Sequence, residues 1–160
     1  MTATQTLVAD VLDGLFGTWQ ADATLATYGD RLLISDGPPV IDRSAEIELW
    51  VGATGLESEE TVVTGTQDWV TLGDAADDRD ESMDVTNAIW VAAGSTDIKT
   101  ARRLAITVFS AAAAAVRGSN LGINALDPTV QVVSWELHQG QFSSGVGAVL
   151  TFVVRATGQL

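Results

Sequence analysis

The residue types that could support catalysis are few, because the chain has one histidine, His138, and no cysteine. Ser-His-Asp catalysis would have to use this histidine, and a general base elsewhere would have to be a carboxylate. His138 lies in strand register with Ser134 and Glu136. No G-x-S-x-G motif accompanies it, since Ser143 and Ser144 lie in a glycine-flanked turn. We therefore interpret His138 as a surface or interface histidine, and expect no enzymatic activity.

An acidic segment is the best candidate for a metal site. Asp78, Asp80 and Ser82 occupy the first, third and fifth positions of a calcium-loop pattern. The sixth position of that pattern is a glycine, but here it is Met83, and the twelfth is a glutamate, but here it is Ile89. Because the pattern is incomplete, we predict a solvated loop too charged to pack, with no metal ion and no cofactor.

The remaining sequence motifs give no support for a dinucleotide-binding loop, a P-loop or cysteine chemistry. The glycine clusters at 118–122 and 145–147 complete neither G-x-G-x-x-G nor a P-loop. The absence of cysteine excludes disulfides, thiolate nucleophiles and cysteine-based zinc sites. The sequence therefore predicts a protein that works by binding other subunits.

The charge of the chain restricts its partners. The 160 residues carry a formal charge of -13, from 21 acidic and 8 basic residues, and Lys99 is the sole lysine. Affinity for nucleic acid depends on lysine and arginine, so DNA binding is disfavoured, although an acidic wall lets a duplex pass without sticking. No apolar run is long enough to span a membrane and no secretory leader is evident, so we expect a soluble, cytoplasmic product.

Two helices are predicted from apolar residues at three- and four-residue spacing. The first extends from about Thr4 to the mid-twenties, and Gly14 and Gly17 weaken it. The second lies near 96–117, begins at an N-cap in Ser95–Asp97 and ends at Gly118. The apolar stripe of the first helix consists of Leu7, Val8, Val11, Leu12, Leu15, Phe16 and Trp19.

A period of two predicts the strands, at 31–35, 45–51, 61–72, 83–92, 129–139 and 146–156. The last two form a C-terminal hairpin. Val149 and Val153 make both faces of its final strand apolar, so a neighbouring subunit is a candidate to cover one of them. We predict a single α+β domain over 1–160, with an antiparallel or mixed sheet packed by the two helices.

Two groups of residues are candidates for a subunit interface. Trp50 shares its predicted face with Glu46 and Glu48, which makes burial within the monomer difficult and favours an interface anchor. Trp135, by contrast, is expected in the core with Val133 and Leu137. The second group is a basic cluster on the polar face of the second helix, and it consists of Lys99, Arg102 and Arg103. These residues either form local ion pairs or meet an acidic neighbouring subunit.

With this order of elements, several stretches resemble the tail-terminator, or tail-completion, proteins of long-tailed bacteriophages. The resemblance extends over most of the chain and consists of loose patterns. They are Trp69-Val70-Thr71-Leu72-Gly73, Ile89-Trp90-Val91-Ala92-Ala93-Gly94, Ala101-Arg102-Arg103, Leu121-Gly122 and Gly147-Ala148-Val149-Leu150-Thr151-Phe152-Val153-Val154.

The resemblance implies a virion protein of the tail or neck, assembled in the host cytoplasm. Such a protein forms a ring, commonly of six subunits, that caps the tail tube, stops its polymerisation and joins the capsid neck. DNA would pass through an acidic lumen without specific binding. We expect the loops at 74–81 and 140–145 to reach axial partners or the lumen, through Asp74, Asp77, Asp78, Asp80, Glu81, Gln141 and Phe142.

Two alternatives remain open at this point. The chain could be another ring-forming component, such as a head-tail connector or a tube subunit. It could also be a small-ligand-binding domain or a hydrolase that uses carboxylates brought together by folding.

Overall fold

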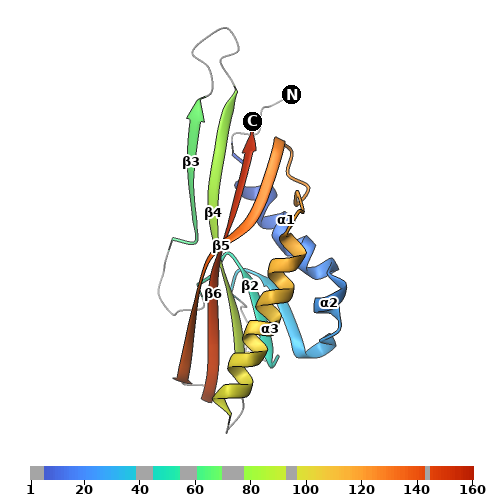
Figure 1. The fold of residues 1–160 in the computed structure, drawn as a ribbon, viewed down its shortest axis with the longest axis vertical. Coiled ribbons are helices and arrows are strands. Elements are labelled where there is room, and N and C mark those ends of the chain that lie inside the picture. The colour runs from blue at the N-terminus through green and yellow to red at the C-terminus, as the bar shows by residue number, and fades with distance from the viewer. Residues whose placement is uncertain (1–5, 39–44, 55–60, 70–77, 93–96, 143–144) are drawn as a thin grey trace.

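The computed structural model describes residues 6–38, 45–54, 61–69, 78–92, 97–142 and 145–160 (Figure 1). Its long strands run along the long axis of the molecule, and the helices lie on one side of the sheet. The elements are α1 (Val8–Ala21), α2 (Ala23–Ala26), a 3-10 turn (Gly29–Arg31), β1 (Leu32–Asp36), β2 (Ile47–Val51), β3 (Val63–Trp69), β4 (Arg79–Ala92), α3 (Ile98–Val116), β5 (Leu126–Phe142) and β6 (Gly145–Gln159).

The sheet is mixed, with the strand order β1-β2-β4-β6-β5, and β3 pairs with the outer part of β4. Among the described strands, β1 and β2 pair in parallel and the other pairs are antiparallel. This confirms the predicted α+β class with an antiparallel or mixed sheet and a C-terminal hairpin. No helix within the described ranges is long and apolar enough to cross a membrane.

The predicted N-terminal helix is divided in two at Asp22. This residue leaves the helical conformation and caps α2, because its side chain accepts a hydrogen bond from the backbone N–H of Leu25 at 2.8 Å. Val11, Leu15 and Trp19 are the buried positions of α1, so the predicted apolar stripe faces the core.

The second helix, α3, begins and ends close to the predicted residues. Asp97 is its N-cap and accepts hydrogen bonds from the backbone N–H of Lys99 and the hydroxyl of Thr100. Gly118 follows its end with φ of +72°, the left-handed conformation that glycine adopts at low cost. The helix packs against β4, β5 and β6.

The core lies between the sheet and the helices. One row of paired residues crosses five strands and is entirely aliphatic: Ile34, Leu49, Ile89, Leu150 and Leu137. Because paired residues share a face of the sheet, this row gives the helices a continuous apolar surface. Leu49, Ile89 and Leu150, at the centre of the row, are at most 1% exposed.

Trp50 is buried within the monomer, so its prediction as an exposed interface anchor is wrong. All five residues of β2 are buried, including Glu48, and the indole N–H of Trp50 donates to the Glu48 carboxylate at 2.8 Å. Trp50 is 4% exposed and packs with Ala53 and Ala88 on the sheet face away from the core. Val149, on the same face, is completely buried by the chain itself, whereas Val153 is half-buried and lines an open groove, so the face assigned to a neighbouring subunit is covered only in part.

The acidic segment is also less loop-like than predicted. Its residues 79–82 belong to β4, and Glu81 is 4% exposed. The carboxylate of Glu81 accepts hydrogen bonds from the Thr6 hydroxyl at 2.5 Å and from the Leu7 backbone N–H at 2.9 Å. Glu81 therefore holds the start of α1 and does not reach a partner. Asp74 and Asp77 lie outside the described residues.

The expected core position of Trp135 is wrong, since its side chain is 61% exposed. A register shift in β5 between Val132 and Ser134 breaks the alternation around Val133. Trp135 pairs with Phe152 on the helix side of the sheet, but β5 is an edge strand and α3 leaves Trp135 open to solvent.

The two glycines of α1 should respond in opposite ways to alanine. A Cβ on Gly14 would lie 2.3 Å from the Leu121 carbonyl oxygen, whereas one on Gly17 would meet nothing within 4 Å. Gly17→Ala should raise the free energy of unfolding by about 0.5–1 kcal/mol, and Gly14→Ala should lower it by about 1–3 kcal/mol. Urea unfolding of the two variants checks this; equal shifts would show that α1 does not approach the Leu121 loop so closely.

Candidate interaction surfaces

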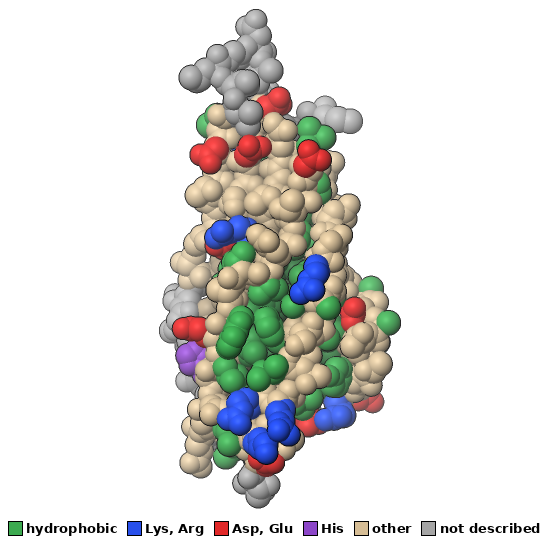
Figure 2. Space-filling view, viewed as in Figure 1, with side chains coloured by type: hydrophobic (Ala, Val, Ile, Leu, Met, Phe, Trp, Pro, Cys, Tyr) green, Lys and Arg blue, Asp and Glu red, His purple; other side chains and the backbone are tan. Residues whose placement is uncertain are grey.

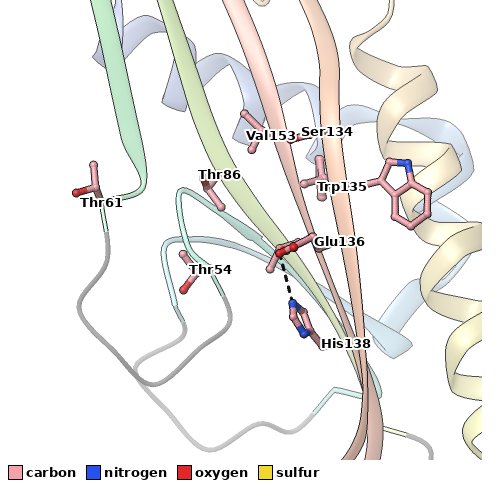
Figure 3. A pocket seen from close by; sticks show the side chains of 10 residues that line it. Thr54, Thr61, Thr86, Ser134, Trp135, Glu136, His138 and Val153 are labelled. Carbon is pink, nitrogen blue, oxygen red and sulfur yellow. Dashed lines mark ion pairs between the residues drawn. The ribbon is translucent and has the colours of Figure 1, made fainter.

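An open groove of about 380 Å³ lies on the face of the sheet that the helices leave uncovered (Figure 3). The side chains of Glu136 and His138 point toward each other in it, with 3.6 Å between Oε2 and Nε2. Both are exposed. The groove is lined by Thr54, Thr61, Thr86, Ser134, Trp135, Glu136, His138, Thr151, Phe152 and Val153.

The order of these side chains along β5 does not build a catalytic triad. In a triad, the histidine lies between the nucleophile and the carboxylate. Here Glu136 lies between Ser134 and His138 on one face of the strand, so the serine and the histidine are about 13 Å apart along it. The groove is therefore a polar surface in which the histidine has a carboxylate neighbour but no adjacent nucleophile on its own strand.

The predicted basic cluster lies together at one end of the molecule, which we call the basic end (Lys99, Arg102 and Arg103). Figure 2 shows lysine and arginine side chains gathered at the lower end of the visible face, below an apolar area. The guanidinium of Arg102 donates to the Gln139 side-chain oxygen at 3.2 Å, which ties the cluster to β5. Within the described ranges, none of the three cations has a carboxylate partner within 4.0 Å.

Two other cations in the described chain, Arg31 and Arg155, have carboxylate partners. The Arg155 guanidinium binds both carboxylate oxygens of Asp84 at 2.7 Å, across the β4–β6 ladder. This hydrogen bonding lowers the pKa of Asp84. Arg31 binds Glu46 in the same bidentate way and lowers its pKa. The basic end has no such salt bridge within the described ranges, although Asp97 at the start of α3 interacts electrostatically with Arg103.

An apolar patch adjoins the basic end, and sequence analysis missed it. We call it the edge patch; it consists of Ile106, Phe109 and Trp135. Ile106 is 44% exposed, and the rings of Phe109 and Trp135 lie 6.5 Å apart between α3 and β5. Ile106 follows Lys99 by seven residues and Arg103 by three, so helical periodicity places it on the stripe that the cluster starts. That spacing was the available signal.

The opposite end of the molecule is acidic. Asp68 and Asp80 are direct cross-strand partners on β3 and β4, and like charges in such positions repel. Asp127 lines the same hollow, and Asp78 precedes β4. Figure 2 shows acidic side chains at the upper end, away from the basic cluster. We call Asp68, Asp78, Asp80 and Asp127 the acidic end; within the described residues, no group of three potential ligands converges into a metal site.

The residues predicted to reach axial partners or the lumen therefore divide between two ends. Asp78 and Asp80 lie at the acidic end, and Gln141 lies near the far end of β5, exposed to solvent. Phe142 ends that strand, and its side chain lies outside the described part. The two sets cannot meet the same neighbour on one face of the molecule.

Comparison with solved structures shows a likeness of fold. No protein-family model matches the chain, and no curated protein shows a significant sequence match. A chain in the solved structure described as the virion of a native gene transfer agent particle has the same fold, with a TM-score of 0.68. The match covers 98% of this chain and 100% of that chain at 13% identity, which shows a shared fold.

Proposed function

We propose that this chain is a structural protein of a phage-like virion and, within it, the tail terminator. Its subunits would form a ring, of six copies in the form that the sequence resemblance implies. The ring would cap the tail tube and join it to the neck. The observation that carries the proposal is the nearly complete match to the fold of a gene transfer agent virion chain. The sequence resemblance to tail-terminator proteins gives the position within the particle.

The charge distribution supports a terminator. If the subunits of a ring all point the same way along its axis, one ring face carries the acidic ends and the other face does not. A tube subunit that matches one face would not match the other, so polymerisation would stop at the ring. The overall charge of -13 per subunit also disfavours the trapping of DNA that passes through the ring.

The purified protein tests the proposal by native mass spectrometry and negative-stain microscopy. We expect closed rings, and when rings are added to polymerising tube subunits, we expect capped tubes that stop growing. Long filaments of this chain alone would identify a tube subunit instead. A chain that stays monomeric at all concentrations and leaves tube growth unchanged would refute the terminator.

Deletion of the gene gives a second readout in the particle. A terminator mutant should accumulate overlong tubes and tailless heads, whereas loss of a tube subunit should leave no tubes. In this proposal the chain contributes no catalytic step and binds no cofactor, so its function depends on the surfaces that meet other subunits.

A further inference from the structure

β1 and β5, the first and last strands in the order β1-β2-β4-β6-β5, run in opposite directions. β1 is parallel to β2, β2 is antiparallel to β4, and β4 and β5 are both antiparallel to β6. If the edges of the sheet form the contacts in a ring of identically oriented copies, the β5 side of each subunit meets the β1 side of the next. Such a contact joins two different surfaces, so the two sides must complement each other.

The β5 side combines positive charge with apolar surface. It contains the basic end and the edge patch, and the contact between Arg102 and Gln139 fixes the position of the cations along β5. Trp135, at 61% exposure, is the largest apolar side chain on this side. We call this surface the α3–β5 flank.

The β1 side has the opposite character, with Leu33 39% exposed and with the exposed carboxylates of Asp30 and Asp36. Within the described part of the chain, neither carboxylate takes part in an ion pair. Leu33 is one of the few large apolar side chains left exposed in the described structure. We call Asp30, Leu33 and Asp36 the β1 flank.

The sheet register places the two flanks at the same level. The row that begins at Leu32 on β1 passes through β2, β4 and β6 and ends at Gln139, the residue that Arg102 contacts. The row of Leu33 ends at His138 by the same pairings. Asp30, two residues before Leu32, therefore lies at nearly the same height along the strands as the basic end. In a flat ring the two flanks can then meet without a shift of one copy along the ring axis.

We propose that the α3–β5 flank of one copy binds the β1 flank of the next copy. The inference rests on the proposed ring and names the surfaces that close it. Copies that each carry -13 repel one another, so association is favoured where one copy offers cations that form no salt bridge in the described structure, together with apolar surface, to carboxylates of the other. The edge patch supplies apolar surface on the helix side of the sheet, and Leu33 supplies it on the opposite face, in the row of His138.

Charge reversal followed by a charge swap tests the inference. Arg102→Glu with Arg103→Glu should weaken ring assembly at least roughly tenfold, because like charges then face each other across the contact. Adding Asp30→Lys and Asp36→Lys restores opposite charges and the original net charge, and should restore the rings. Mass against protein concentration, measured by light scattering and native mass spectrometry, gives the apparent dissociation constant for each variant.

A matched control uses the same helix. Arg117 is exposed at the end of α3, so Arg117→Glu makes the same charge change as Arg103→Glu but outside the flank. Only Arg103→Glu should weaken assembly. If the wild type forms rings and neither reversal nor swap changes their stability, the flank contact is wrong and the terminator proposal stands. If the wild type forms no rings, both proposals fail.

Cross-linking gives a test that does not depend on ring stability. Because the chain has no cysteine, Leu33→Cys with His138→Cys introduces two thiols at the ends of one row of the sheet. A short bismaleimide should link copies of this variant into a ladder of oligomers. In the control, Leu33→Cys with Thr129→Cys, the second thiol lies on β5 about 30 Å from the position of residue 138. This variant should remain largely unlinked. Equal linking of both variants, or none in the first, would overturn the inference.

Discussion

Replacing Trp19 by alanine is expected to lower the free energy of unfolding by about 3–5 kcal/mol, the usual range for a buried tryptophan. Trp19 is completely buried and packs edge-on against Phe152, with 5.7 Å between the ring centroids. Its indole N–H donates to the Ala112 carbonyl of α3 at 3.0 Å, so one side chain connects α1, α3 and the sheet. The loss would be a large part of the roughly 5–15 kcal/mol typical of a domain.

Trp19→Phe is the matched control for this prediction. Phenylalanine keeps an aromatic ring against Phe152 but cannot donate to the Ala112 carbonyl, so its loss should be less than half that of alanine. Urea unfolding followed by far-ultraviolet circular dichroism measures both variants without using tryptophan fluorescence. A loss below about 1 kcal/mol for Trp19→Ala would show that α1 is not held to the core through this residue.

Trp19 was assigned correctly from sequence because local periodicity decides its position. Val11, Leu15 and Trp19 follow one helical stripe, and all three are buried. The same reasoning found α3, the final hairpin and the class of the fold. The short parallel pairing of β1 with β2 has no local signal, since strand direction depends on the path of the connecting chain.

The two tryptophans at candidate surfaces were assigned in reverse. Trp50 alternates with Glu46 and Glu48, which predicts a wet face, but β2 is interior and Glu48 accepts the indole hydrogen bond. Trp135 alternates with apolar residues, which predicts a buried face, but the register shift near Val133 and the edge position of β5 leave it exposed. Alternation therefore showed which residues share a face of a strand. It did not show which of the faces the rest of the chain buries.

The candidate site was predictable only in part for the same reason. Lys99, Arg102 and Arg103 share a helix face by spacing alone, and the structure groups them as expected. Their proximity to Trp135 and their level relative to β1 depend on tertiary pairing across five strands. The complementary flanks could therefore be derived only after the sheet order and register were known.

Glu81 shows most clearly how a distant contact overrides a local pattern. It lies in a charge run that indicates a loop, yet β3 and β6 pair with this part of β4 and turn Glu81 toward the core side. The start of α1, more than seventy residues away in sequence, supplies two hydrogen-bond donors to its carboxylate. A buried carboxylate is tolerated when such donors satisfy it.

Glu81→Ala should therefore lower the free energy of unfolding by about 2–3 kcal/mol, because the buried Leu7 N–H loses its acceptor and the Thr6 hydroxyl loses a charged partner. Glu81→Gln keeps a carbonyl acceptor in the same position, so it should lose less than Glu81→Ala. Thr6→Val removes only one donor and should have the smallest effect. Urea unfolding ranks the variants, and amide exchange at Leu7 should quicken most in Glu81→Ala. Equal losses for alanine and glutamine would mean that packing of the side chain, rather than its acceptor, holds the start of α1.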